Sequence, residues 1–125
     1  MKTQLAAEQS AKLIELGVSP ERASKRTFDL KDVNNLSKPL ERRELLPIFT
    51  LADILDILPK KITFGHRTNC RLKMQPIISS KDRISEVWQA CYLHTSLKAN
   101  AEAPELIDAL YSLLVRCLEK GYVKL

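Results

Sequence analysis

The chain has 125 residues, of which 45% are hydrophobic and 28% charged, with three glycines and six prolines. This length suits one domain, and the composition excludes a disordered, low-complexity or collagen-like chain. The net charge of +5 comes from residues 1–83, which hold 16 Lys and Arg against 10 Asp and Glu, whereas residues 84–125 hold 4 against 5. So modest an excess permits nucleic acid as a partner but does not require it.

Membrane spans and export signals are absent from the pattern. No apolar run approaches the roughly 18 to 20 residues that a spanning helix needs, and the first ten residues lack the apolar stretch of a signal peptide. The three cysteines, Cys70, Cys91 and Cys117, are odd in number and far apart, which favours buried free thiols over a disulfide scaffold. We therefore expect a cytoplasmic protein with no membrane partner.

The first quarter of the chain reads as helical. Residues 3–16 form a loose apolar face that ends at Gly17, and Ser19-Pro20-Glu21 is typical of a second helix start, over residues 20–26. The two helices predict a helical hairpin over 1–27 that lies as an adjunct to the core. Residues 28–46 are rich in turn formers and are expected to be an irregular connector.

An α+β core is predicted over residues 47–125. It begins with a helix over 51–58, in which Thr50 is the N-cap, Asp53 completes a capping box, and Phe49 packs on Ile54. Pro59 ends that helix.

The pattern then changes to a period of two, which predicts a β-hairpin. One face of the hairpin would be buried, and it carries Ile62, Phe64, Cys70, Leu72 and Met74. The other face carries Lys61, Arg71 and Lys73. Residues 79–83 form the next turn, and a third strand follows over Ile84–His94 with apolar residues on both faces.

The last predicted helix is strongly amphipathic, begins at Pro104-Glu105 and ends at Gly121. The pattern also permits a final short strand over residues 122–125. Taken together, the pattern predicts a single-domain α+β fold. A small antiparallel sheet of three to four strands would be packed by the long C-terminal helix and the short central helix.

Several of these segments resemble a family of small uncharacterised proteins from phages, prophages and mobile elements of gut bacteria. The likeness lies in residues 49–60 (FTLADILDILPK), 105–111 (ELIDALY), 119–124 (EKGYVK) and 16–20 (LGVSP). These motifs are caps and core stripes. The resemblance implies the fold class and a phage-related, cytoplasmic origin, and it supplies no catalytic residue.

No constellation points to catalysis, a cofactor or a metal. Glycine occurs only at positions 17, 65 and 121, which excludes phosphate-binding glycine loops. His66 with Cys70 is a poor zinc pair, and Cys91 with His94 would point to opposite faces of a strand. The carboxylate pairs Asp53/Asp56 and Glu105/Asp108 fall in first turns of helices, where they favour the helix dipole. We therefore expect a protein that is not an enzyme.

Two sets of residues are candidates for binding. The first is the basic set on the hairpin, which could follow a phosphate backbone or could keep an edge hairpin soluble. Its members are Lys60, Lys61, Arg67, Arg71 and Lys73. The second is the pair Trp88 and Tyr92, which would lie in the core or in a contact with a partner. The leading hypothesis is a non-catalytic accessory protein that acts through protein–protein contacts, with an unidentified partner or as a homo-oligomer. The alternative is a weak nucleic-acid-binding protein.

Overall fold

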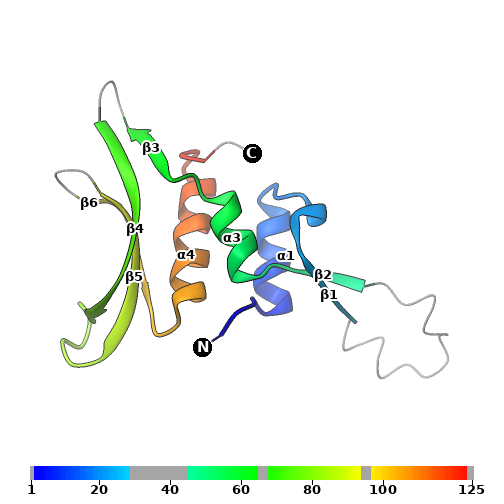
Figure 1. The fold of residues 1–125 in the computed structure, drawn as a ribbon, viewed down its shortest axis with the longest axis horizontal. Coiled ribbons are helices and arrows are strands. Elements are labelled where there is room, and N and C mark those ends of the chain that lie inside the picture. The colour runs from blue at the N-terminus through cyan, green and yellow to red at the C-terminus, as the bar shows by residue number, and fades with distance from the viewer. Residues whose placement is uncertain (1, 29–44, 65–67, 94–96, 124–125) are drawn as a thin grey trace.

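The computed structural model describes residues 2–28, 45–64, 68–93 and 97–123 (Figure 1). Within these ranges it is an α+β protein with antiparallel strands and a C-terminal helix, as predicted. The helices are α1 (Ala7–Glu15), α3 (Leu51–Ile57) and α4 (Leu106–Glu119), with a 3₁₀ turn at Pro20–Arg22. The strands are β1 (Lys25–Phe28), β2 (Leu45–Ile48), β3 (Lys61–Phe64), β4 (Thr68–Ile78), β5 (Glu86–Leu93) and β6 (Leu97–Ala103).

The larger sheet is a four-stranded antiparallel meander in the order β3-β4-β5-β6. α4 packs on β5 and β6, and α3 and α1 follow behind it, so that these three helices lie on one side of the sheet (Figure 1). An antiparallel sheet can leave its other face to water, and here no described helix covers that face. A two-stranded ribbon, β1-β2, lies at the far side of the helices.

Among the described residues, one hydrophobic core runs from Leu5 in the N-terminal segment to Val123 after α4. The buried stripe of α4 forms its centre, because apolar side chains recur there at helical spacing. That stripe consists of Ile107, Ala109, Leu110, Leu113, Leu114 and Cys117. In the described part of the chain, no helix is long and apolar enough to cross a membrane.

The helix ends follow the predicted capping chemistry. Thr50 accepts a hydrogen bond from the backbone N–H of Asp53, and the Asp53 carboxylate accepts one from Thr50 N–H, which closes the capping box. At the other ends, Gly17 and Gly121 have φ values of 109° and 74°. After Gly121, Tyr122 N–H donates to the Cys117 carbonyl, as in a Schellman motif.

The predicted N-terminal helical hairpin is wrong in its second half. The Ser19 cap and Pro20 do start a helical turn, but the turn ends at Arg22, and Lys25–Phe28 forms a strand that pairs with Leu45–Ile48. The carboxylate of Asp53 explains the change, because it accepts hydrogen bonds from both the N–H and the hydroxyl of Ser24 and holds the chain extended there. The N-terminal region is also part of the core, since Leu5, Leu13 and Val18 are buried in it.

The predicted connector over 28–46 begins and ends in strands, and residues 29–44 lie outside the described residues. The third strand starts at Glu86 rather than Ile84. β6 was not predicted, and residues 122–123 do not form a strand. Met74, predicted to be buried with the rest of its hairpin face, is exposed, because α4 lies over β5 and β6 rather than over that part of β4.

Candidate protein-contact surface

The basic residues of the hairpin lie on the open face of the sheet. Register places Lys61 of β3 directly opposite Arg71 of β4, and Lys73 follows two positions along β4 on the same face. All three side chains are exposed, and within the described ranges none of them forms an ion pair. Lys60 is exposed just before β3, while Arg67 lies outside the described residues. We call Lys60, Lys61, Arg71 and Lys73 the basic cluster.

The rest of the open face carries polar residues together with the apolar pair Ile77 and Val87, which lie opposite each other on β4 and β5. Gln75 and Gln89 form a cross-strand hydrogen bond of 2.8 Å between their side chains. Cys91, opposite Lys73, is fully buried, and this burial raises the pKa of its thiol although the Lys73 charge opposes the effect. The Glu102 carboxylate accepts hydrogen bonds from Ser80, which lower the pKa of Glu102. No described position on this face is aromatic, so it offers no platform for stacking bases.

Trp88 and Tyr92 differ in their surroundings. Tyr92 is 0% exposed and its hydroxyl donates to the Pro59 carbonyl at 2.6 Å, so the interface alternative is wrong for this side chain. Burial raises the pKa of Tyr92 strongly. Trp88 is only half-buried, packs at the margin of the core, and lies opposite the exposed Pro76.

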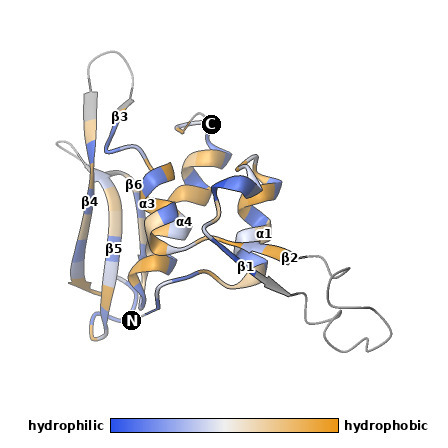
Figure 2. Ribbon diagram, turned by 45° about the vertical axis from the view of Figure 1, so that its right-hand side comes forward, coloured by the Kyte–Doolittle hydropathy of each residue, from blue (hydrophilic) through white to orange (hydrophobic). Residues whose placement is uncertain are grey.

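The most unusual surface lies at the free end of the β4–β5 hairpin. Met74 is 40% exposed, Ile78 54% and Ile84 83%, and these are three of the four large hydrophobic residues that are exposed among those described. Met74, Pro76 and Ile78 share the face of β4 that is turned toward the helices, and Ile84 lies in the turn that ends the hairpin. Figure 2 shows this long hairpin at one edge of the molecule, where β5 packs on α4 and β4 lies farther out. We call Met74, Pro76, Ile78, Ile84 and Trp88 the hairpin strip.

The sequence contained a signal for this strip. The alternation predicted a buried hairpin face as far as Met74, but alternation does not show where the covering helix ends. β4 has 11 residues and β3 only 4, so most of β4 extends beyond its first partner. Pro76 in the middle of the strand indicates an edge there, because proline cannot donate to a central ladder.

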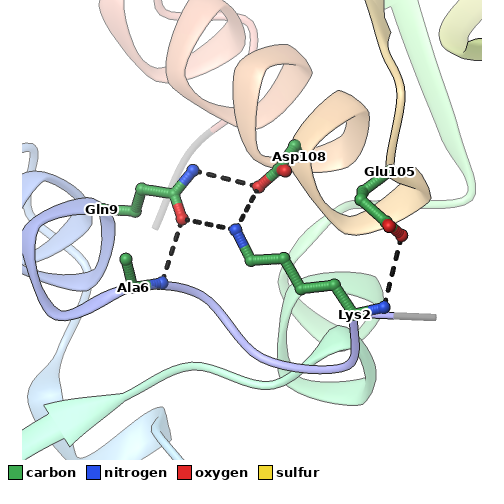
Figure 3. Close-up of polar contacts among 5 residues, drawn as sticks. All are labelled: Lys2, Ala6, Gln9, Glu105 and Asp108. Carbon is green, nitrogen blue, oxygen red and sulfur yellow. Dashed lines mark hydrogen bonds and ion pairs between the residues drawn. The ribbon is translucent and has the colours of Figure 1, made fainter.

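The carboxylate pairs have structural roles. Asp53 completes its cap, and Asp56 pairs with Arg22 at 3.4 Å. Figure 3 shows the second pair: Asp108 accepts from Lys2 Nζ at 2.9 Å and from Gln9 Nε2 at 3.1 Å, and Glu105 accepts from the Lys2 backbone N–H at 3.2 Å. This network fastens the N-terminal segment to the first turn of α4.

Metal and thiol chemistry find little support in the described residues. Across those ranges, no group of three or more His, Cys, Asp or Glu side chains is arranged to hold a metal ion. The zinc and nucleophile pairs weighed from the sequence involve His66 and His94, both outside the described residues. The three cysteines are buried and free, and burial raises the pKa of Cys117 to about 11.

Comparison with known proteins gives no family assignment: no protein-family model, no curated protein and no solved structure matches the chain. A function for this chain is therefore proposed from its surfaces.

Proposed function

We propose that this protein is a non-catalytic accessory protein that acts through protein–protein contacts made by the hairpin strip. The observation that carries the proposal is that Met74, Pro76 and Ile78 are exposed along one face of β4 and that Ile84 is exposed in the turn after it. Isolated exposed hydrophobic residues are ordinary, whereas a contiguous apolar patch on a small protein marks a contact site. The half-buried Trp88 suits such a site, because aromatic residues are enriched in the centres of interfaces.

The setting of this function is also a proposal. The resemblance to small proteins of phages, prophages and mobile elements supports a phage-related role in the cytoplasm of a bacterial cell. An accessory protein of that kind would bind a protein of the host or of the same mobile element.

The test uses affinity capture from extracts of the native cells with three matched baits. The baits are the wild-type protein, an Ile78→Lys/Ile84→Lys variant, and a Leu55→Lys control. Leu55 is 36% exposed on α3 and is the fourth exposed large hydrophobic residue, so the control adds charge at an apolar site outside the strip. We expect the wild type and the control to retain the same partner and the double variant to lose it. Equal capture by all three would contradict the proposal.

A second candidate function is nucleic-acid binding by the basic cluster. It is favoured by one observation, the placement of Lys61, Arg71 and Lys73 on one open face with no ion pair in the described part of the chain. A titration against labelled duplex DNA and RNA would test it. Three phosphate contacts predict a slope of log K against log salt of roughly −2.7 on DNA, lost in Arg71→Glu/Lys73→Glu. No binding at low salt would exclude this candidate.

A further inference from the structure

The two edges of the larger sheet differ in how their backbone hydrogen-bonding groups are satisfied. At the β6 edge, the Arg116 guanidinium of α4 donates to the Asn100 carbonyl, so a side chain occupies part of that edge. At the other edge, β3 pairs with β4 only as far as Arg71, and one further bond joins Leu72 N–H to the Lys60 carbonyl at 2.9 Å. Beyond Leu72 no described strand pairs with this side of β4.

The direction of the free backbone groups follows from that last hydrogen bond. In an antiparallel strand, alternate residues direct both N–H and C=O to the same neighbour. Leu72 faces β3, and Ser79 N–H donates to Ser85 on the β5 side, so even-numbered residues of β4 face the open edge. Met74 and Ile78 therefore present N–H and C=O groups there. Pro76 presents only its carbonyl.

The side chains along this edge divide by face. Met74, Pro76 and Ile78, which belong to the hairpin strip, lie on the face turned toward the helices. The open face of this stretch carries Lys73, Gln75 and Ile77, and Lys61 of β3 lies opposite Arg71, two positions before Lys73. A strand added here would have side chains about 5 Å from those of β4 on each face. It would meet apolar groups on one face, and Lys73 with the uncharged Gln75 and Ile77 on the other.

From this arrangement we infer that the β4 edge over residues 73–78 binds an extended peptide segment by β-strand addition. The segment runs antiparallel to β4, as β3 does. Its side chains alternate between apolar ones, which lie on Met74 and Ile78, and acidic ones, which lie beside Lys73 and Lys61. This inference rests on the proposed protein-contact function, and it names the kind of partner: an extended segment that alternates apolar and acidic residues.

A second copy of this chain fits the edge less well. In edge-to-edge pairing about a twofold axis, both strands would bring Pro76 into the ladder, and each would lack that donor. Proline and lysine at an exposed edge are common protections against self-pairing.

The probe is a fluorescein-labelled octapeptide of alternating valine and glutamate, titrated onto the full-length protein and followed by anisotropy. Two N-methylated forms separate edge pairing from other contacts. Valine residues direct their N–H groups to β4 when their side chains lie on the strip, whereas glutamate N–H groups point away. Methylation at two central valines should weaken binding roughly 30-fold, the effect of two hydrogen bonds. Methylation at two glutamates should change it little.

Variants of the protein provide the second arm. Met74→Pro removes an edge donor without touching the ladder to β5, so it should weaken binding about fivefold more than Met74→Ala, the effect of one hydrogen bond. Lys73→Glu should weaken the valine–glutamate peptide and strengthen a valine–lysine one. In ¹⁵N-edited spectra, the peptide should shift the amide signals of Met74 and Ile78 rather than those of β6.

Four outcomes would overturn the inference. These are equal binding by the two N-methylated peptides, shifts confined to β6, a dimer in sedimentation that Met74→Pro dissolves, and oligonucleotide binding with no peptide binding. Equal binding by the methylated peptides, together with loss of binding in Ile78→Lys, would end strand addition but leave the hairpin strip as a contact surface. No peptide binding and no loss of partner in Ile78→Lys/Ile84→Lys would end both proposals.

Discussion

The corner around Asp53 and the free end of the β4–β5 hairpin both reverse the usual placement of side chains, with a charged group inside at one and hydrophobic groups outside at the other. At the corner, a charged group is nearly buried, and its oxygens accept hydrogen bonds from Thr50 N–H at 2.9 Å and Ser24 N–H at 2.8 Å. At the hairpin end, Ile78 and Ile84 face solvent. The corner therefore contributes stability that the fold needs, whereas the hairpin end contributes little and is free to serve recognition.

The largest effect should come from the apolar side of the corner. Phe49 is fully buried, its carbonyl accepts from Leu5 N–H, and its N–H donates to the buried Ser10 hydroxyl at 3.2 Å. Phe49→Ala removes a ring from a packed site that joins the N-terminal segment to α3. We expect it to lower the free energy of unfolding by about 3–5 kcal/mol, measured by urea titration. A loss below about 1 kcal/mol would show that the corner is not part of the stable core.

The next effect tests the polar side of the corner. Asp53→Ala removes the cap of α3 and leaves the Ser24 and Thr50 N–H groups without their acceptor, which should cost about 2–3 kcal/mol. Burial alone would raise the pKa of Asp53, but the hydrogen bonds from Ser24 and Thr50 outweigh it and lower the pKa below 3.8. Because the folded pKa is the lower one, this contribution is complete above about pH 4 and is lost as the pH falls through the folded value.

Unfolding titrations at several pH values measure that dependence. The gap between wild type and Asp53→Ala should be constant from pH 5 to 7 and should narrow toward pH 3. Thr50→Ala is a matched control, because it removes the other half of the capping box but no titratable group. A gap that widens in acid would contradict the assigned role of Asp53.

The same comparison explains what the sequence could predict. The Thr50–Asp53 cap and the glycine stops at Gly17 and Gly121 are local signals, and the structure confirms them. The strand at Lys25–Phe28 was missed because Asp53, distant in sequence, fixes Ser24. β6 was missed because alanine alternates there with polar residues, and alanine is a poor indicator of strands.

The candidate site was predicted only in part, for a related reason. Alternation along residues 61–73 placed Lys61, Arg71 and Lys73 on one face, and the register confirms that placement. The exposure of Met74 and Ile78 depends on where α4 crosses the sheet, which no local pattern reveals. The sequence therefore predicted which face of a strand each side chain occupies, because that depends on near neighbours. It did not predict which side chains are buried, because burial depends on a helix that is distant in sequence.

A smaller effect on stability is expected where the N-terminal segment contacts the first turn of α4. Asp108 lies in the first turn of the helix, where its charge favours the dipole, and it accepts from Lys2 and Gln9. Asp108→Ala should lower the free energy of unfolding by about 1 kcal/mol, because the ion pair is partly exposed. Part of the loss should disappear at high salt, whereas a Gln9→Ala control should be insensitive to salt. An equal salt response in the two variants would contradict the ionic role.

The smallest effect on the free energy of unfolding is predicted at the hairpin end, because its exposed side chains contribute little to the stability of the fold. Ile84→Ser changes a side chain that is 83% exposed, so the free energy of unfolding should stay within about 0.5 kcal/mol of wild type. Ile78→Ser, at 54% exposure, should change it only slightly more. Urea titrations of both variants against Phe49→Ala give the measurement. A loss above about 1 kcal/mol in Ile84→Ser would mean that this isoleucine already packs within its own chain. The hairpin end would then resemble the Asp53 corner, and its apolar residues would no longer need a partner to explain them.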